Sequence, residues 1–146
     1  MLRRSLLVAC LAGAGAGLAL GDWPPDAERA RLNYMLNCQG CHLPTGQGVP
    51  GSVPRISNYL GNFLRVPGGR EFVVQVPGSA NAAMDNAALA ELLNWLLVTM
   101  SPNELPESWQ PYTAQEVGVL RATPLREVAA VRARLVERIE QSSAGP

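Results

Sequence analysis

Five consecutive residues, Cys38-Gln39-Gly40-Cys41-His42, constrain this chain more than any other feature of its sequence. They form C-x-x-C-H, the motif that attaches a haem covalently. Two thiols three positions apart can each form a thioether with one porphyrin vinyl group, and the adjacent imidazole then lies beneath the ring, where it can bind the iron. The chain contains one histidine, and it is His42. We therefore expect a haem on Cys38 and Cys41 with His42 as an iron ligand.

Three other kinds of site share part of this motif. A thioredoxin-like redox pair also has the form C-x-x-C, but it follows a strand in a β-α-β pattern, which this sequence does not show. A zinc site needs about four ligands, and the sequence after the N-terminal segment offers no further thiol or imidazole. A structural disulfide between Cys38 and Cys41 would close a very small loop and would leave the histidine unexplained.

The N-terminus has the composition of an export signal. Two arginines, ending at Arg4, precede an apolar, Gly/Ala-rich run that reaches Leu20. This pattern is typical of a secretory signal peptide, so residues 1–21 are predicted to be a signal and the protein to be periplasmic. An uncleaved membrane anchor is the alternative, and Cys10 is interpreted as an incidental residue of the signal. The remaining chain has the size of one ordinary domain.

Charge and composition exclude several classes of partner. The twelve basic residues are all arginines and are balanced by twelve acidic residues, for a formal net charge of zero. The sequence has no basic block of the kind that binds nucleic acid and no cationic helix for a membrane surface. A Ser/His/Asp catalytic set is ruled out if the one histidine binds iron. We predict no catalytic residues, and an electron-transfer protein rather than an enzyme.

Two segments have clear helix patterns. Asp26 is a good N-cap for a helix over residues 27–37, and Asp85 is one for a Leu-rich helix over residues 86–99. The apolar face predicted for the first helix consists of Leu32, Met35 and Leu36. The second helix has a much broader apolar face and is predicted to end at Ser101-Pro102.

The segments between and after these helices are less regular. The Gly/Pro-rich residues 43–54 predict a loop, and residues 56–64 a short helix. The Phe72-Val73-Val74 run is ambiguous between strand and helix, although its context favours a short helix ended by Pro77-Gly78. Residues 102–146 form a Pro-rich linker and two helices. One is predicted to start at the capping box of residues 113–116. The other is predicted to start at Thr123-Pro124, with an apolar stripe that includes Leu125, Val128, Leu135, Val136 and Ile139.

This order of a helix, C-x-x-C-H, a Gly/Pro-rich loop, short helices and a Leu-rich helix resembles the class I cytochrome c family in its small bacterial mono-haem form. The resemblance covers roughly residues 26–100. It implies an all-α fold in which the first helix packs on the Leu-rich helix around one haem c. The two C-terminal helices expected from the sequence pattern would be an addition to this fold. The predicted division is a signal at 1–21, a haem domain at 22–101 and an extension at 102–146.

The resemblance also implies roles for particular residues. Cys38 and Cys41 would bind the haem vinyl groups, with His42 as the proximal iron ligand. Tyr34, one turn before the first cysteine, would contact Trp95 on the Leu-rich helix. Pro54 fits the family's loop proline, whose backbone carbonyl accepts a hydrogen bond from the proximal imidazole and fixes the orientation of the ring.

The distal ligand is the point at which this sequence departs from the family. The usual methionine, often followed by proline, lies several residues before the last helix, whereas Met84 directly precedes the cap Asp85. A soft thioether suits haem iron, so Met84 is the predicted distal ligand. The alternatives are that Met84 only packs the start of the helix, that Met100 binds the iron, or that no methionine does. Met35 is expected in the core.

The expected function is that of a periplasmic one-electron carrier, which takes electrons from a dehydrogenase and passes them to an oxidase or another cytochrome. Its docking patch would be weakly charged, with Gln39 and Leu43 at the rim of the haem edge. One alternative is an open distal site that binds gases or reacts with peroxide, with Asn81 and Asn86 as candidate hydrogen-bond donors. Another is a fixed haem subunit of a dehydrogenase, docked through its C-terminal helices; packing of these helices on their own chain is the simpler expectation.

Overall fold

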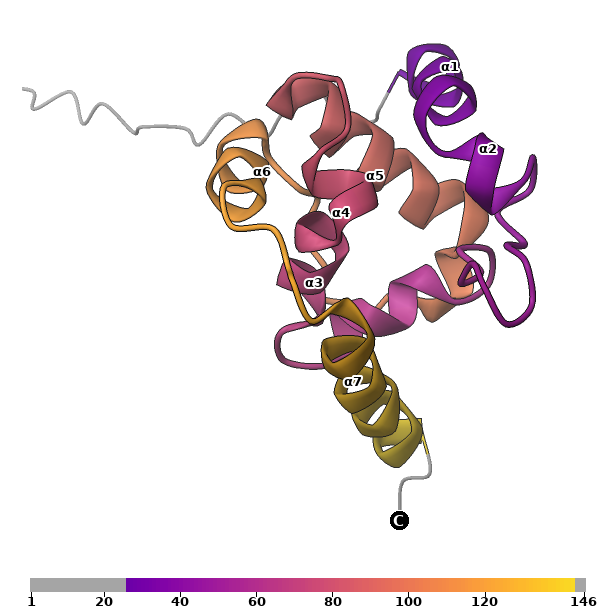
Figure 1. The fold of residues 1–146 in the computed structure, drawn as a ribbon, viewed down its shortest axis with the longest axis vertical. Coiled ribbons are helices and arrows are strands. Elements are labelled where there is room, and N and C mark those ends of the chain that lie inside the picture. Colours follow the sequence, from indigo (N-terminus) through magenta and orange to yellow (C-terminus); the bar gives the residue numbers. More distant parts are fainter. Residues whose placement is uncertain (1–25, 144–146) are drawn as a thin grey trace, which may run out of the picture.

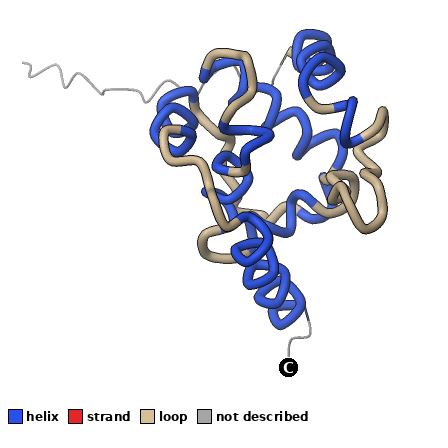
Figure 2. The backbone as a smooth tube through the Cα atoms, viewed as in Figure 1, coloured by secondary structure: helices blue, strands red, loops and turns tan. Residues whose placement is uncertain are grey.

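A computed structural model describes residues 26–143, and they form an all-helical fold without a strand (Figure 2). The predicted signal peptide at 1–21 lies outside this part of the chain. The helices are α1 (Ala27–Asn37), α2 (Gln39–His42), η1 (Leu60–Arg65), α3 (Gly69–Gln75), α4 (Pro77–Ala80), α5 (Asn86–Met100), η2 (Pro102–Glu104), α6 (Ala114–Arg121) and α7 (Val128–Ser143). None of the described helices is long and apolar enough to span a membrane.

Helix α5 forms the centre of the molecule. Every residue from Leu89 to Leu97 is buried, as expected for a helix that is packed on all sides. Helix α1 packs on one side of it and α6 on another. Figure 1 shows α1 and α2 on one side of the molecule, α6 on the opposite side, and α7 projecting from the rest.

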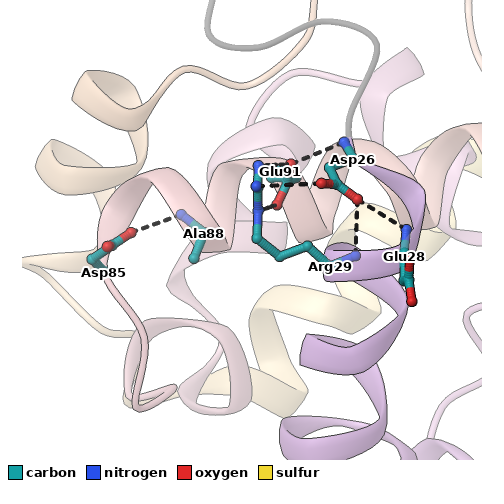
Figure 3. Close-up of polar contacts among 6 residues, drawn as sticks. All are labelled: Asp26, Glu28, Arg29, Asp85, Ala88 and Glu91. Carbon is teal, nitrogen blue, oxygen red and sulfur yellow. Dashed lines mark hydrogen bonds and ion pairs between the residues drawn. The ribbon is translucent and has the colours of Figure 1, made fainter.

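Helix α1 is held to α5 by an ion pair with a buried carboxylate and by an aromatic contact. The Asp26 side chain caps α1 by accepting from the backbone N–H groups of its first turn. Nε and Nη2 of Arg29 donate to the Glu91 carboxylate at 2.7 and 2.6 Å (Figure 3). Further along, the predicted contact between Tyr34 and Trp95 is present, with ring centroids 5.9 Å apart.

The apolar face predicted for α1 points away from the core. Leu32, Met35 and Leu36 are 50%, 43% and 81% exposed, whereas Ala30 and Tyr34 are buried. The reason is that the Arg29 and Tyr34 contacts turn the opposite side of α1 towards α5. The spacing of apolar residues therefore identified the helix but not its buried face.

The middle of the chain is helical where the sequence was ambiguous. Phe72, Val73 and Val74 lie buried in α3. Helix α3 ends at Gln75, with Val76 as its C-cap directly before Pro77, as predicted. Pro77 also begins α4 at its first position, where proline loses no hydrogen bond. Gly69 allows a close approach of two segments, since a Cβ there would lie 1.9 Å from the Phe63 carbonyl oxygen. The short helix predicted within 56–64 is the 3₁₀ helix η1.

The C-terminal extension packs on the rest of the chain. Thr113 caps α6 as predicted, but both oxygens of Glu116 accept from Arg70, so the carboxylate serves an ion pair rather than a capping box. Helix α7 begins at Val128 and not at Thr123-Pro124. The preceding segment is non-helical, and its Leu125 N–H donates to the Gln75 carbonyl, 2.9 Å away.

Two residues fix the linker that leads into α6. Asn94 of α5 donates to the Tyr112 carbonyl at 3.0 Å and accepts from the Tyr112 N–H at 2.7 Å. The Arg70 guanidinium lies 4.1 Å from the centre of the Tyr112 ring and donates to the carbonyls of Gln110 and Pro111. Asn94 and Arg70 thereby join the extension to the core.

Candidate haem-binding site

The two motif cysteines lie one helical turn apart. Cys41 belongs to the one-turn helix α2, and Cys38 is the residue before it. Residues three apart on a helix lie on the same side, so both thiols can reach one ring. Both are free, Cys41 exposed and Cys38 half-buried. Burial, with a smaller effect of Cys41, raises the pKa of Cys38 to about 11.

Helix α2 is in contact with α1 and with the loop that follows it, yet none of its residues is buried. Its surface is therefore accessible to a large apolar group, and the free thiols and His42 belong to this segment. This arrangement fits a covalently attached haem.

The imidazole of His42 is held by the loop that follows it. Its Nδ1 donates to the carbonyl oxygen of Pro54, 3.0 Å away. A carbonyl only accepts, so the proton is on Nδ1 and the lone pair is on Nε2, which is the nitrogen that can bind a metal. Burial lowers the pKa of His42, against an opposing effect of the Pro54 hydrogen bond, and so favours the neutral, ligating form.

The loop after His42 folds back on itself to bring Pro54 into place. Leu43 has a positive φ of 64°, which is unusual for a residue other than glycine. Its carbonyl accepts from the Tyr34 hydroxyl at 2.5 Å, which ties the end of the motif to α1. Gly48 is required where the loop closes, since a Cβ would lie 2.4 Å from the Val53 carbonyl oxygen.

The two other residues expected at the haem edge, Gln39 and Leu43, are half-buried. The Tyr34 hydrogen bond to Leu43 was not predicted. The one indication in the sequence was that the aromatic residue one turn before the motif is a tyrosine, which has a hydroxyl group that can donate a hydrogen bond.

The structure places the candidate methionines in three different environments. Met84 is half-buried and packs against the core beside the start of α5. The sulfur of Met100 lies close to Gly46, where an added Cβ would come within 2.8 Å of it. Met35 is 43% exposed on α1 and is not the core residue that was expected.

Two relatives of known identity match most of this chain. A cytochrome c-552 from Thermus thermophilus is 29% identical over an alignment of 154 residues. The alignment covers 92% of this chain and 98% of the relative. A second cytochrome c-552 from Thermus thermophilus is 30% identical over 130 residues, covering 75% of this chain and 98% of the relative.

This chain belongs to the c-type cytochromes. No family model matches it, so the relatives and the helical fold carry the assignment. The cytochrome has the all-α cytochrome c fold that the sequence predicted. As a member of this family it carries haem c and is an electron-transfer protein.

Proposed function

We propose that this cytochrome holds one haem c through thioethers to Cys38 and Cys41, with Nε2 of His42 as the proximal iron ligand and the Pro54 carbonyl fixing the imidazole ring. The observation that carries this assignment is the hydrogen bond from His42 Nδ1 to Pro54. It directs the other ring nitrogen to a metal and increases its basicity. The haem supplies a one-electron couple, and the chain holds its iron and limits its contact with water.

Haem attachment can be tested with cysteine variants of the full precursor. Cys38→Ala or Cys41→Ala leaves one thioether, so the reduced spectrum in alkaline pyridine should move towards that of a haem with one free vinyl group. The double variant should lose covalent haem. Cys10→Ala is the matched control because Cys10 lies outside the motif. Unchanged haem content in the double variant would contradict the assignment.

We further propose that the protein works in the periplasm, accepting electrons from a dehydrogenase and passing them to an oxidase or another cytochrome. The N-terminal segment supports export, and the exposed Cys41 supports a haem edge near the surface. The exposed side chains of Met35, Leu36 and Val49 on α1 and the following loop are apolar. Exposed apolar side chains of this kind suit brief encounters between redox proteins. Protein from the periplasmic fraction should begin at Asp22.

Electron self-exchange between ferric and ferrous copies tests this surface without a known partner. Leu36→Glu should slow self-exchange, because two copies would then meet through like charges, and raising the salt concentration should restore the rate. Val119→Glu is the control, since Val119 is 69% exposed on the distant helix α6. Equal rates in the two variants would place the exchange surface elsewhere.

A freely diffusing carrier is favoured over a fixed subunit by the packing of the C-terminal helices. Val117, Leu135 and Ile139 are 0%, 3% and 5% exposed, so these apolar side chains of the C-terminal helices are already covered by this chain, whereas Val119 of α6 stays exposed. The purified protein should therefore sediment as a single chain. Stable co-purification with a dehydrogenase, abolished by changes confined to α7, would favour the fixed subunit instead.

A further inference from the structure

The segment before α5 is bound to the C-terminal extension. The guanidinium of Arg121, the last residue of α6, donates to three carbonyls of this segment. Nε reaches Ala80 at 3.0 Å, Nη2 reaches Ala82 at 2.7 Å, and Nη1 reaches Met84 at 2.8 Å. A planar fork with several donors can hold several acceptors at once. Met84 is therefore fixed at its backbone by a side chain from α6.

The residues on either side of Met84 are fixed as well. The Met84 N–H donates to the Ala82 carbonyl at 2.8 Å, and Asp85 caps α5 by accepting from the Ala88 N–H at 2.8 Å (Figure 3). Helix α6 lies so close to the first turn of α5 that a Cβ on Gly118 would come within 2.7 Å of the Asn86 amide nitrogen. These contacts hold Met84 at the start of α5.

The haem motif lies towards the other end of α5. Tyr34, which is hydrogen-bonded to the residue after His42, packs against Trp95 with its ring tilted. The loop beyond the motif reaches the last residue of α5, because the Asn58 N–H donates to the Met100 carbonyl at 2.7 Å. Ten residues separate Asp85 from Trp95, which at 1.5 Å per residue is about 15 Å along the helix axis.

If Met84 bound the iron, its sulfur would have to lie much closer to the haem motif. A methionine that bound the iron together with His42 would have to bring its sulfur close to the His42 imidazole, because both groups would bind the same atom. Only residues 76–85 join α3 to α5, and four of them form α4. Residues 81–85 are the non-helical part of this connection before α5, and the Arg121 hydrogen bonds to the Ala82 and Met84 carbonyls hold that part beside α6. Met84 instead packs against the core next to the cap, the position of a hydrophobic staple.

The positions of Met100 and Met35 do not suit a distal iron ligand either. The Met100 sulfur lies on the loop at Gly46, on the side of the motif that also supplies Pro54 to the proximal imidazole. Met35 is on the exposed side of α1. Among residues 26–143 these three are the methionines that the chain offers.

The buried polar side chains are already paired. Glu91 binds Arg29, Asn94 binds Tyr112, and Ser101 binds Gly61 and Glu104. Asn86, one of the candidate distal donors, accepts from Arg121 on the α6 side. Distal polarity and hydrogen-bond donors decide which ligands a haem favours. These side chains are therefore already engaged and are not free to donate a hydrogen bond to a haem ligand.

We propose that the iron of this cytochrome has no methionine ligand, and that its sixth position binds a small neutral diatomic molecule of the π-acceptor class, such as carbon monoxide or nitric oxide. The proposal rests on the attachment of haem through His42 proposed above. It replaces the prediction that Met84 binds the iron. In it, Arg121 is a positioning residue that keeps Met84 at the start of α5.

Spectroscopy of the matured holoprotein tests this directly. The ferrous protein should be high-spin and should shift on addition of carbon monoxide, and the ferric protein should lack the weak far-red sulfur-to-iron band. Met84→Leu keeps the size and apolar character of the side chain, so it should change neither spectrum and should alter the carbon monoxide dissociation constant less than twofold. Met35→Leu is the matched control on the exposed face of α1.

The same spectra can also overturn the proposal. A low-spin ferrous protein that ignores carbon monoxide, with a far-red band in the ferric state, overturns this proposal. Loss of that band in Met84→Leu or in Met100→Leu would then identify the ligand, and the proposed attachment through Cys38, Cys41 and His42 would stand. A chain that takes up no covalent haem defeats the proposed attachment and this inference together.

Discussion

The ion pair between Arg29 and Glu91 gives a quantitative test of how α1 is held to α5. The Glu91 side chain is 7% exposed, whereas that of Arg29 is 55% exposed. Oε1 of Glu91 accepts from the Asp26 N–H at 2.9 Å and from Arg29 Nη2, and Oε2 accepts from Arg29 Nε. Glu91→Gln keeps the shape but removes the charge, and its NH₂ group would face the Nε–H of Arg29.

The cost of this change follows from the exposure of the two partners. Breaking a fully buried pair costs about 3–5 kcal/mol, because a charge is left without a partner in the interior. In Glu91→Gln the remaining charge is the half-exposed Arg29, which water can reach, so we expect a loss of about 2 kcal/mol. Arg29→Met leaves the buried Glu91 charge behind and should cost more, about 3–4 kcal/mol.

Urea unfolding of the ferric holoprotein, followed by far-UV circular dichroism, measures both values. For a chain of this size about 2 kcal/mol corresponds to a fall in melting temperature of roughly 8 °C. Glu28→Gln is the control because Glu28 is exposed in the first turn of α1, and it should change stability by less than about 0.5 kcal/mol. If Glu91→Gln proves as costly as Arg29→Met, or if neither exceeds the control, the reasoning from burial is wrong.

Three further changes test other parts of the fold. Gly69→Ala forces a methyl group against a backbone carbonyl and should destabilise the protein by roughly 3 kcal/mol or more, measured by urea unfolding. In the control Gly78→Ala the methyl group meets nothing within 4 Å, so the stability should hardly change. Asp85→Ala removes the cap of α5 and should cost about 1 kcal/mol, measured by thermal unfolding; a cost below about 0.3 kcal/mol would show that the cap is dispensable. Arg70→Met releases the linker before α6. Limited proteolysis should then cut near residue 110 roughly tenfold faster than in the unchanged protein, while the haem spectrum stays the same. Equal cleavage rates in the two proteins would refute that role of Arg70.

Local features were the ones that the sequence revealed. The caps Asp26, Asp85 and Thr113 act on backbone groups within their own first turns, so their helices could be predicted from neighbouring residues. The motif at Cys38–His42 is local in the same way. The Tyr34–Trp95 contact was predicted only because the chain resembles a known family.

Features that depend on distant residues were not predictable. The exposed side of α1 is set by what Arg29 and Tyr34 meet on α5, and periodicity does not contain that information. The late start of α7 accompanies the hydrogen bond from Leu125 to Gln75 of α3. The role of Arg121 requires three carbonyls far earlier in the chain, and an arginine at the end of a helix has no sequence signature for such contacts.

The arginines also affect how partners of this cytochrome can be found. Arg65, Arg70 and Arg121 use their guanidinium groups to hold backbone carbonyls of other segments, a task that the single ammonium of a lysine performs poorly. The chain has no lysine at all. Amine-reactive cross-linkers and labels will therefore modify only the free N-terminus, which makes that terminus a unique attachment point for a dye or an electrode. Carboxylate-directed or photoreactive reagents are the ones suited to capturing a redox partner at the exposed side of α1.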